Sequence, residues 1–316
     1  MPDNSSAASA AETLAKRVLA GDTAAASRSL SLIINEAPEA DILIAAFFPK
    51  SGQAQKIGVC GPPGAGKSTL TGRLVTHFRK QGLKVGILAV DPSSPISGGA
   101  FLGDRLRIQE HAMDPGVFIR SVATRGMVGG VSHTIFGAIH ALEAWGCDRV
   151  IVETVGTGQD EVIIASVADT VAYVTTPTMG DEIQAMKAGV MEIADVFVVN
   201  KADLAGKDKA VSDLKAALGL GRGHEPEPWD TPVVATSALN GEGVPELAAA
   251  FDAHWKHLKD SGEGRNRLKR QHKEEVSLFV SRRVYQDALA QLDRYLDDLV
   301  DGKTDPAAVG RALLKR

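Results

Sequence analysis

Residues 61–69 read GPPGAGKST, directly after the apolar run KIGVC at 56–60. The pattern G-x-x-x-x-G-K-[ST] is met by Gly61, Gly66, Lys67 and Ser68. Such a loop needs residues without a Cβ, because consecutive backbone N–H groups must point inward around phosphate oxygens while the next helix adds its dipole. Since a helical pattern follows to about Lys80, the stretch predicts a P-loop between a strand and a helix.

This loop predicts the phosphate side of a nucleotide site. Lys67 is expected to reach the β- and γ-phosphates, and Ser68 is expected to ligate Mg²⁺. The expected contacts to the nucleotide are made by Gly61, Pro62, Pro63, Gly64, Ala65, Gly66, Lys67, Ser68 and Thr69. A nucleotide-free scaffold is the structural alternative, which a nucleotide-binding titration would test.

The pattern around the loop predicts an α/β fold. Seven short β-branched runs alternate with longer helical patterns between 56 and about 258: KIGVC, KVGILAV, GVFIRSV, DRVIVETV, DTVAYVTT, ADVFVVNK and TPVVATSA. Runs that are apolar on both faces, with helices between them, are typical of a mostly parallel sheet with helices on both sides.

Three regions are expected along the chain. Residues 1–50 form a helical extension of two or three helices, 51–260 form the P-loop domain, and 261–316 form a second helical extension. The segment SGEGRNR at 261–267 is a predicted hinge. The last region has an apolar stripe made of Val276, Phe279, Val280, Val284 and Leu289.

Composition limits the classes of function. The chain has 316 residues, 44% of them hydrophobic, and a formal net charge of −4. A full core is therefore expected, and no overall basic field draws the protein to nucleic acid or to an anionic membrane. The two cysteines, Cys60 and Cys147, favour a reducing compartment. With no signal-peptide pattern and no run of 18 apolar residues, we expect a cytoplasmic protein.

A guanine-specific base site is predicted downstream. Residues 200–203 read NKAD at a strand end, where the Asp203 carboxylate can accept hydrogen bonds from N1–H and the exocyclic amine of guanine. Asn200 is expected to brace the loop, and the Lys201 stem to lie over the ring. The expected second base loop contains Ser237, Ala238 and Leu239, with the Ala238 N–H directed at the guanine oxygen.

Acidic residues at other strand ends predict the metal site. Asp91 follows KVGILAV, Asp104 lies in the next loop, and Glu153 ends RVIVE. Carboxylates at the ends of parallel strands beside a phosphate loop suit Mg²⁺, held directly or through water. Gly156 is a candidate for binding the γ-phosphate through its N–H, and Gln159 for orienting water.

The motifs GPPGAGKST, DPSSP, FLGDR, ETVGTGQDE, GDEIQAMKAG and NKAD occur in that order, and the chain resembles the ArgK/MeaB family of P-loop GTPases. The resemblance implies a SIMIBI-class GTPase fold with helical extensions. It also implies a homodimeric chaperone of an adenosylcobalamin-dependent acyl-CoA mutase, such as methylmalonyl-CoA mutase, that gates cofactor loading and protects or reactivates the mutase. The family's mobile switch matches Asp181, Glu182 and Lys187.

One departure and two alternatives stay open. The residues before GDE read TPTM, where the family pattern leads us to expect a Pro-Gly-Ala run, so the partner could act on isobutyryl- or 2-hydroxyisobutyryl-CoA. A nickel-type metallochaperone GTPase would need clustered ligands, but the eight His are scattered; His133 and His140 are read as packing or surface residues. The other alternative is a kinase of a periplasmic transport protein. We expect no nucleic-acid or membrane partner and no tightly bound cobalamin.

Overall fold

The computed structural model describes residues 4–91, 109–111, 113–123, 134–154, 161–179, 188–221 and 228–314. The chain divides into two compact units, Met1–Leu268 and Lys269–Arg316. All the strands belong to the first unit. Within the described ranges, every helix is too short or too polar to cross a membrane.

The centre of the first unit is a seven-stranded sheet. Its strands are β1 (Gln55–Cys60), β2 (Val85–Asp91), β3 (Val117–Ala123), β4 (Arg149–Thr154), β5 (Thr170–Thr175), β6 (Val196–Val199) and β7 (Val233–Ala235). Their order is β3-β2-β4-β1-β5-β6-β7, and each neighbouring pair is parallel. The prediction of a sheet built from these seven runs is confirmed, and its described strands are all parallel.

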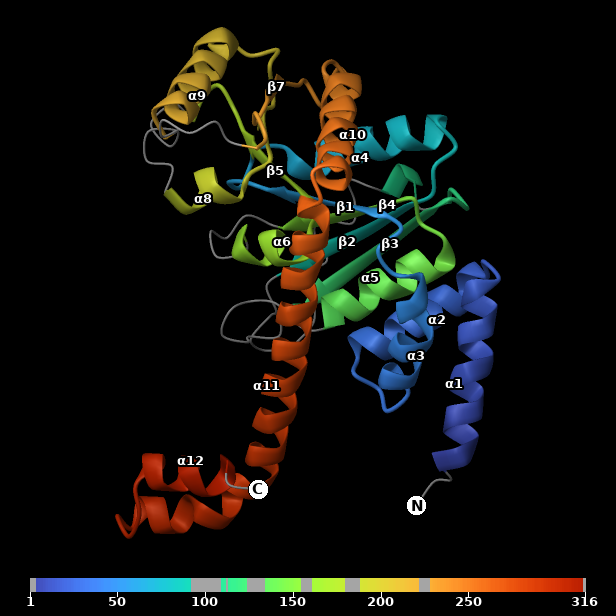
Figure 1. Cartoon of the computed structure of the whole chain (residues 1–316), viewed down its shortest axis with the longest axis vertical. Helices are drawn as coiled ribbons and strands as arrows, with labels where there is room; N and C mark the ends of the chain where they lie inside the picture. The colour runs from blue at the N-terminus through green and yellow to red at the C-terminus, as the bar shows by residue number, and fades with distance from the viewer. Residues whose placement is uncertain are drawn as a thin grey trace. The chain divides into compact units, whose positions relative to one another are not determined.

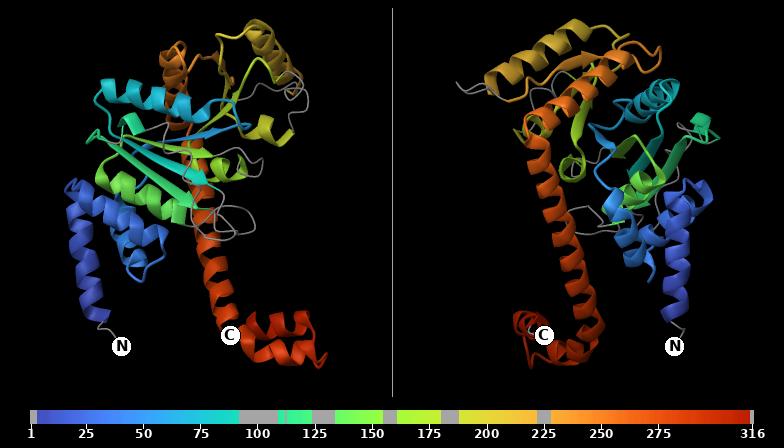
Figure 2. Two further views of the ribbon diagram at one scale, coloured as in Figure 1. Left: turned by 180° about the vertical axis from the view of Figure 1, so that it is seen from behind. Right: turned by 45° about the vertical axis from the view of Figure 1, so that its right-hand side comes forward.

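Helices cover both faces of this sheet. One face is covered by α4 (Lys67–Lys80) and α10 (Val244–Asp260), and the opposite face by α5 (Thr134–Trp145) and α6 (Glu161–Val167) (Figures 1 and 2). The other helices that the structure describes in this region are η3 (Gln109–His111), α8 (Ala188–Ile193) and α9 (Lys207–Gly221). On the first face, Leu74 and Phe251 belong to the same buried apolar cluster as Ile57 of the central strand. Burial of both faces explains why the strands lack polar alternation.

The N-terminal region forms three helices, α1 (Asn4–Leu19), α2 (Thr23–Ile34) and α3 (Ala40–Phe47), followed by the short helix η1 (Phe48–Lys50). Helices α2 and α3 pack on the outer side of α5, so that all twelve residues of α5 are buried (Figure 1). At Gly137 an added Cβ would approach Ile33 and Ile44 to 2.8 Å. The close contact between these helices therefore requires glycine, and α5 is buried around its whole circumference because both of its sides are covered.

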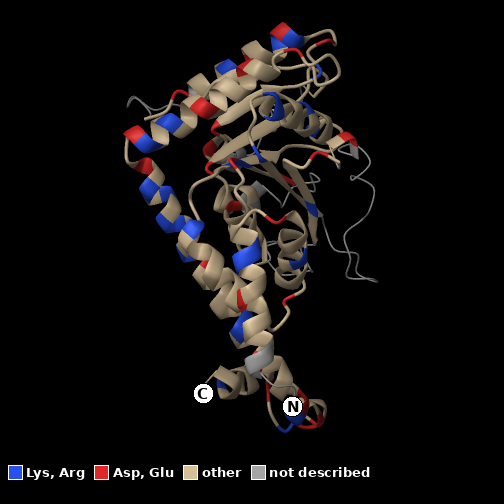
Figure 3. Cartoon of the chain, turned by 90° about the vertical axis from the view of Figure 1, so that its right-hand side faces the viewer, with Lys and Arg blue, Asp and Glu red and all other residues tan. Residues whose placement is uncertain are grey.

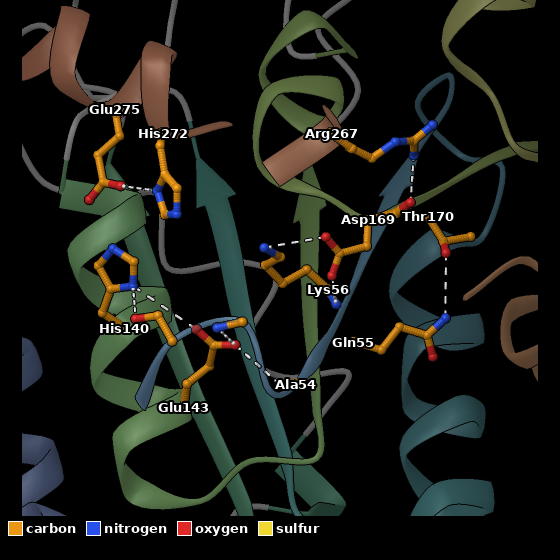
Figure 4. A network of polar contacts seen from close by, with 12 residues as sticks. Ala54, Gln55, Lys56, His140, Glu143, Asp169, Thr170, Arg267, His272 and Glu275 are labelled. Carbon is orange, nitrogen blue, oxygen red and sulfur yellow. Dashed lines mark hydrogen bonds and ion pairs between the residues drawn. The ribbon is translucent and has the colours of Figure 1, made fainter. Parts of the chain in front are cut away.

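A buried polar network crosses the amino ends of the strands (Figure 4). Lys56 Nζ lies 3.3 Å from Asp169 Oδ1, and the Arg267 guanidinium donates bonds of 2.7 and 2.9 Å to the two carboxylate oxygens of Asp195. Glu143 accepts hydrogen bonds from the backbone N–H groups of Gly52 and Ala54. The network thus connects the segment before β1, the sheet and the first turns of the C-terminal helix that begins at Glu263.

Two buried histidines belong to the same region. His254 Nε2 lies 3.2 Å from Asp195 Oδ1, while its Nδ1 lies 2.9 Å from Thr170 Oγ1. His140, 4% exposed, lies 2.6 Å from Ser51 Oγ through its Nδ1. His140 is therefore a packing residue, as expected, whereas His133 lies outside the described residues.

The C-terminal helices are α11 (Glu263–Val300) and α12 (Pro306–Leu314). The break between α10 and α11 consists of Ser261 and Gly262 only. Residues 263–267 of the predicted hinge are helical, so that prediction is wrong for most of the segment. Glycine is tolerated in the first turn of a helix, and Arg267 holds this turn to Asp195.

Candidate functional site

The loop between β1 and α4 has the backbone that a phosphate cradle needs. Gly61 has φ 133°, and an added Cβ there would come within 2.1 Å of the Val174 carbonyl oxygen. Gly66 has φ 89°, and its Cβ would come within 2.5 Å of Asn200 Nδ2. Both positions therefore exclude any other residue, by backbone conformation and by space. The α4 helix starts at the next residue, so its N-terminal dipole is directed at the loop.

Lys67 is folded into this loop. Its side chain is 6% exposed, and Nζ donates hydrogen bonds to Gly61 O at 2.8 Å and to Pro62 O at 3.1 Å. These bonds hold the ammonium group against the concave backbone where phosphate oxygens would bind. The ammonium supplies a positive point charge there, in addition to the partial charge of the helix terminus.

Ser68 and Glu153 meet at the carboxyl end of the sheet. Ser68 Oγ donates a hydrogen bond of 2.5 Å to Glu153 Oε1, and the two side chains are 7% and 5% exposed. A hydroxyl and a carboxylate are hard oxygen donors, so this pair fits Mg²⁺ beside the phosphates. Asp91 ends β2, the strand next to β4, and the structure describes its backbone but not its side chain.

Asn200 ties the phosphate loop to the loops that follow β6 and β7. Its Nδ2 donates to Ala65 O at 2.8 Å, while its Oδ1 accepts from Thr236 Oγ1 and from Ala238 N, both at 3.1 Å. Asn200 is 1% exposed. The bracing role expected for Asn200 has a concrete geometry here, because one amide bridges three segments that are distant in the sequence.

The base side of the site is formed by residues 201–203 and 237–239. Lys201 has φ 57°, a left-handed conformation that is uncommon for lysine, and its Cε lies 3.9 Å from the Cβ position built at Gly66. Asp203 Oδ1 accepts a hydrogen bond of 2.6 Å from Ser237 Oγ. A left-handed lysine next to the phosphate loop and a carboxylate held by Ser237 are compatible with base recognition.

The structure brings many of the expected site residues together. Around the phosphate loop it places Gly61, Pro62, Pro63, Gly64, Ala65, Gly66, Lys67, Ser68, Thr69 and Glu153, and around the base loops Asn200, Lys201, Asp203, Ser237, Ala238 and Leu239. Asp104, Gly156, Gln159, Asp181, Glu182 and Lys187 lie outside the described residues. Arg73 of α4 was missed by sequence reasoning, since a single exposed arginine on a helix gives no signal; it donates to Ala238 O and Leu239 O.

The parallel sheet, the glycine loop and the helix that starts at Lys67 define a P-loop nucleoside triphosphatase fold. Comparison with known proteins narrows this class. The model of the family described as "Methylmalonyl Co-A mutase-associated GTPase MeaB" matches residues 26–293. The chain belongs to this family of P-loop GTPases, and the predicted fold class and GTPase activity are thereby confirmed.

Similar proteins agree with this assignment. "Putative GTPase PH0274" of Pyrococcus horikoshii is 45% identical over 287 residues, which is 90% of each chain. "Methylmalonic aciduria type A homolog, mitochondrial" of Mus musculus is 38% identical over 221 residues, or 69% of this chain and 53% of the mouse protein. The crystal structure of an "LAO/AO transport system kinase" matches with a TM-score of 0.73 and 27% identity, covering 99% of this chain and 98% of that chain.

Proposed function

We propose that this GTPase is a chaperone of an adenosylcobalamin-dependent acyl-CoA mutase, such as methylmalonyl-CoA mutase, and that it works in the cytoplasm. In this role it gates cofactor loading and protects or reactivates the mutase. The observation that carries the proposal is the family match over 26–293, because the family is described by its association with methylmalonyl-CoA mutase. The name of the mouse relative points to the same metabolism.

The chemistry assigned to the site is GTP hydrolysis. Lys67 and the loop N–H groups bind the β- and γ-phosphates, and Asp203 reads the base edge. The groups that would hold Mg²⁺, directly or through water, are Ser68, Asp91, Asp104 and Glu153. When bound, the ion neutralises charge that develops on the phosphates during transfer. The assigned roles of Gly156 and Gln159 are to sense the γ-phosphate and to orient the attacking water.

The coupling to the mutase is assigned to Asp181, Glu182 and Lys187. These residues follow β5 in the sequence, and β5 pairs with β1, the strand that leads directly into the phosphate loop. A change at the γ-phosphate can then bias the segment between two arrangements. Coupling energies of this kind are typically about 1–3 kcal/mol, which corresponds to roughly a 5- to 150-fold change in affinity.

A stimulation assay tests this function. The purified chain is mixed with methylmalonyl-CoA mutase, and with mutases for isobutyryl- and 2-hydroxyisobutyryl-CoA, and GTP hydrolysis and cofactor transfer are measured. We expect one mutase to accelerate hydrolysis and to be captured differently with GDP and with a non-hydrolysable GTP analogue. Lys187→Ala should blunt the acceleration, whereas Lys209→Ala, an exposed lysine on α9, should not. The absence of binding and stimulation with every mutase would contradict the chaperone role.

A homodimer is the second part of the proposal. Exposed apolar residues follow one another along α11: Val276, Phe279, Val280, Val284, Tyr285, Leu289, Leu296 and Val300. They are 42–85% exposed, and such a stripe on a helix is typical of a pairing surface. Lys and Arg are concentrated in the first half of α11 (Figure 3), where Arg265, Arg267, Lys269, Arg270 and Lys273 occur.

Replacing Val280 by Glu should shift the mass in light scattering from dimer to monomer, whereas Arg282→Glu should not.

Kinase activity toward a transport protein is the second candidate, favoured by the similarity to the solved transport system kinase, with its TM-score of 0.73. A kinase transfers the γ-phosphate to a protein, whereas a GTPase releases it as inorganic phosphate. Incubation with γ-labelled GTP and a periplasmic binding protein separates the two functions. Label retained on that protein would favour the kinase, and release of all label as phosphate would exclude it under those conditions.

A further inference from the structure

Arg73 connects the phosphate-binding helix to the base-binding loop. It lies on α4, six positions after Lys67, and its guanidinium donates from Nε to Ala238 O at 2.9 Å and from Nη2 to Leu239 O at 2.8 Å. One planar guanidinium group thus binds two neighbouring carbonyls through two different nitrogens. Lysine has a single nitrogen and lacks this geometry. The contact spans 165 residues of sequence.

These two bonds set the direction of a backbone donor. The described chain has no cis peptide bonds, and in a trans peptide the C=O and N–H groups point in opposite directions. Because Ala238 O is directed at Arg73, the N–H of the same peptide, which belongs to Leu239, is directed away from it. Arg73 therefore determines the orientation of the Leu239 N–H.

The neighbouring N–H groups of the loop have partners. Ala238 N–H donates to Asn200 Oδ1 at 3.1 Å, and Asn240 N–H lies 3.4 Å from Ser237 Oγ. Within the part of the chain that the structure describes, the Leu239 N–H is bonded to no acceptor. The Leu239 side chain is 72% exposed. The loop thus presents a donor of fixed direction beside Asp203, which is bonded to Ser237 of the same loop.

We propose that Arg73 is a positioning residue for guanine recognition and that it aims the Leu239 N–H at the O6 atom of the base. This inference rests on the proposed base site at residues 200–203 and 237–239. Asp203 accepts from the N1–H and the 2-amino group, and the Leu239 N–H donates to the oxygen next to them. Adenine carries an amino group in place of that oxygen, so the oriented N–H discriminates against it. The sequence pattern predicts Ala238 as this donor, but the Ala238 N–H is already shared with Asn200.

Comparison of GDP with 6-thio-GDP tests the inference, because sulfur replaces the O6 acceptor while N1–H and the 2-amino group remain. Affinities of both nucleotides are measured by calorimetry at pH 7 for the wild type, Arg73→Ala, Arg73→Lys and Lys80→Ala. Lys80 is an exposed residue at the far end of the same helix and serves as the control. Thermal unfolding of each nucleotide-free protein reports on the fold.

The wild type should bind GDP more tightly than 6-thio-GDP. In Arg73→Ala we expect GDP affinity to fall about tenfold, the size of one lost hydrogen bond, with a smaller fall for 6-thio-GDP, so the ratio approaches one. KM for GTP should rise more than kcat falls. Arg73→Lys should be intermediate, and Lys80→Ala should match the wild type.

Two results would overturn the inference, and they are distinguishable. If Arg73→Ala weakens both nucleotides equally, or neither, then Arg73 does not direct a donor at O6. If Asp203→Asn keeps the wild-type preference for GDP over XDP, the base lies elsewhere and the proposed site fails together with the inference.

Discussion

The Ser68 hydroxyl and the Glu153 carboxylate are joined by a hydrogen bond of 2.5 Å, which connects the first turn of α4 to the end of β4. The bond places a P-loop hydroxyl and a strand-end carboxylate, 85 residues apart in sequence, at one buried point. Mg²⁺ would bind these oxygens beside the phosphates. Substitutions in this pair should therefore affect hydrolysis more than nucleotide binding.

Glu153→Gln should reduce hydrolysis far more than binding. The amide keeps the size of the side chain and removes its charge, and the metal and water matter most as charge develops in the transition state. We expect kcat to fall about 100-fold while GDP affinity changes less than about threefold. Turnover and calorimetry are compared with Glu246→Gln, an exposed glutamate on α10. Asp91→Ala should behave like Glu153→Gln, and equal losses in binding and turnover would contradict the assignment.

Lys67→Ala should abolish tight nucleotide binding. The side chain places a buried ammonium group against two loop carbonyls, and alanine removes that charge from the phosphate loop. The expected loss of GDP affinity is at least about 100-fold, since hydrogen bonds to charged groups contribute about 1.5–3 kcal/mol each. Lys80→Ala, at the other end of α4, is the matched control. Unchanged calorimetric affinity in Lys67→Ala would remove the loop from the nucleotide site.

Asp203→Asn should change base preference from guanine to xanthine. The carboxylate accepts hydrogen bonds, whereas the amide can donate to the oxygen that xanthine carries in place of the amine. We expect the ratio of GTP to XTP affinity to fall by about 10² or more, because the hydrogen bond at position 2 of the base changes polarity while N1–H remains a donor. Competition binding measures the ratio, with Asp208→Asn, an exposed aspartate on α9, as the control. A wild-type ratio in Asp203→Asn would place the base elsewhere.

His254 should make stability depend on pH between about 6.5 and 4. Burial lowers the pKa of this histidine from 6.5 to about 4, while the nearby Asp195 opposes the shift. The unfolded chain therefore binds a proton at a higher pH than the folded chain does. The stabilisation is complete above pH 6.5 and is lost as the pH falls to about 4, a change on the order of 3 kcal/mol.

Urea unfolding at pH 7, 6, 5 and 4.5 measures this dependence. His254→Gln removes the titrating ring, so the difference in unfolding free energy between the wild type and the variant should shrink as the pH falls. Gln53→Ala, which changes an exposed side chain that carries no titrating group, should keep a constant difference. A constant difference for His254→Gln as well would show that the ring titrates normally in the folded protein.

Local sequence patterns by themselves determined the elements and the class of chemistry. The seven β-branched runs, the glycine spacing of residues 61–66 and the helical pattern to Lys80 each depend on neighbours within about one element. A parallel sheet buries its strands on both faces, so the strand signal is strong in composition alone. The NKAD motif is also local, because the left-handed Lys201 and the base-reading Asp203 both lie within its four residues.

Only the tertiary structure decided which of these groups meet. Asn200 reaches Ala65 across 135 residues and Arg73 reaches Ala238 across 165, and neither partner is encoded near the other. Tertiary packing also decided that every residue of α5 is buried beneath α2 and α3. It likewise decided that Asp195 holds Arg267, in a segment whose glycines suggested a hinge. The contacts of Asn200 and Arg73 form because strand order, which differs from chain order, brings together the segments at the carboxyl ends of β1, β6 and β7. Local propensity carries no information about that order, since it is set by how the helices pack on the completed sheet.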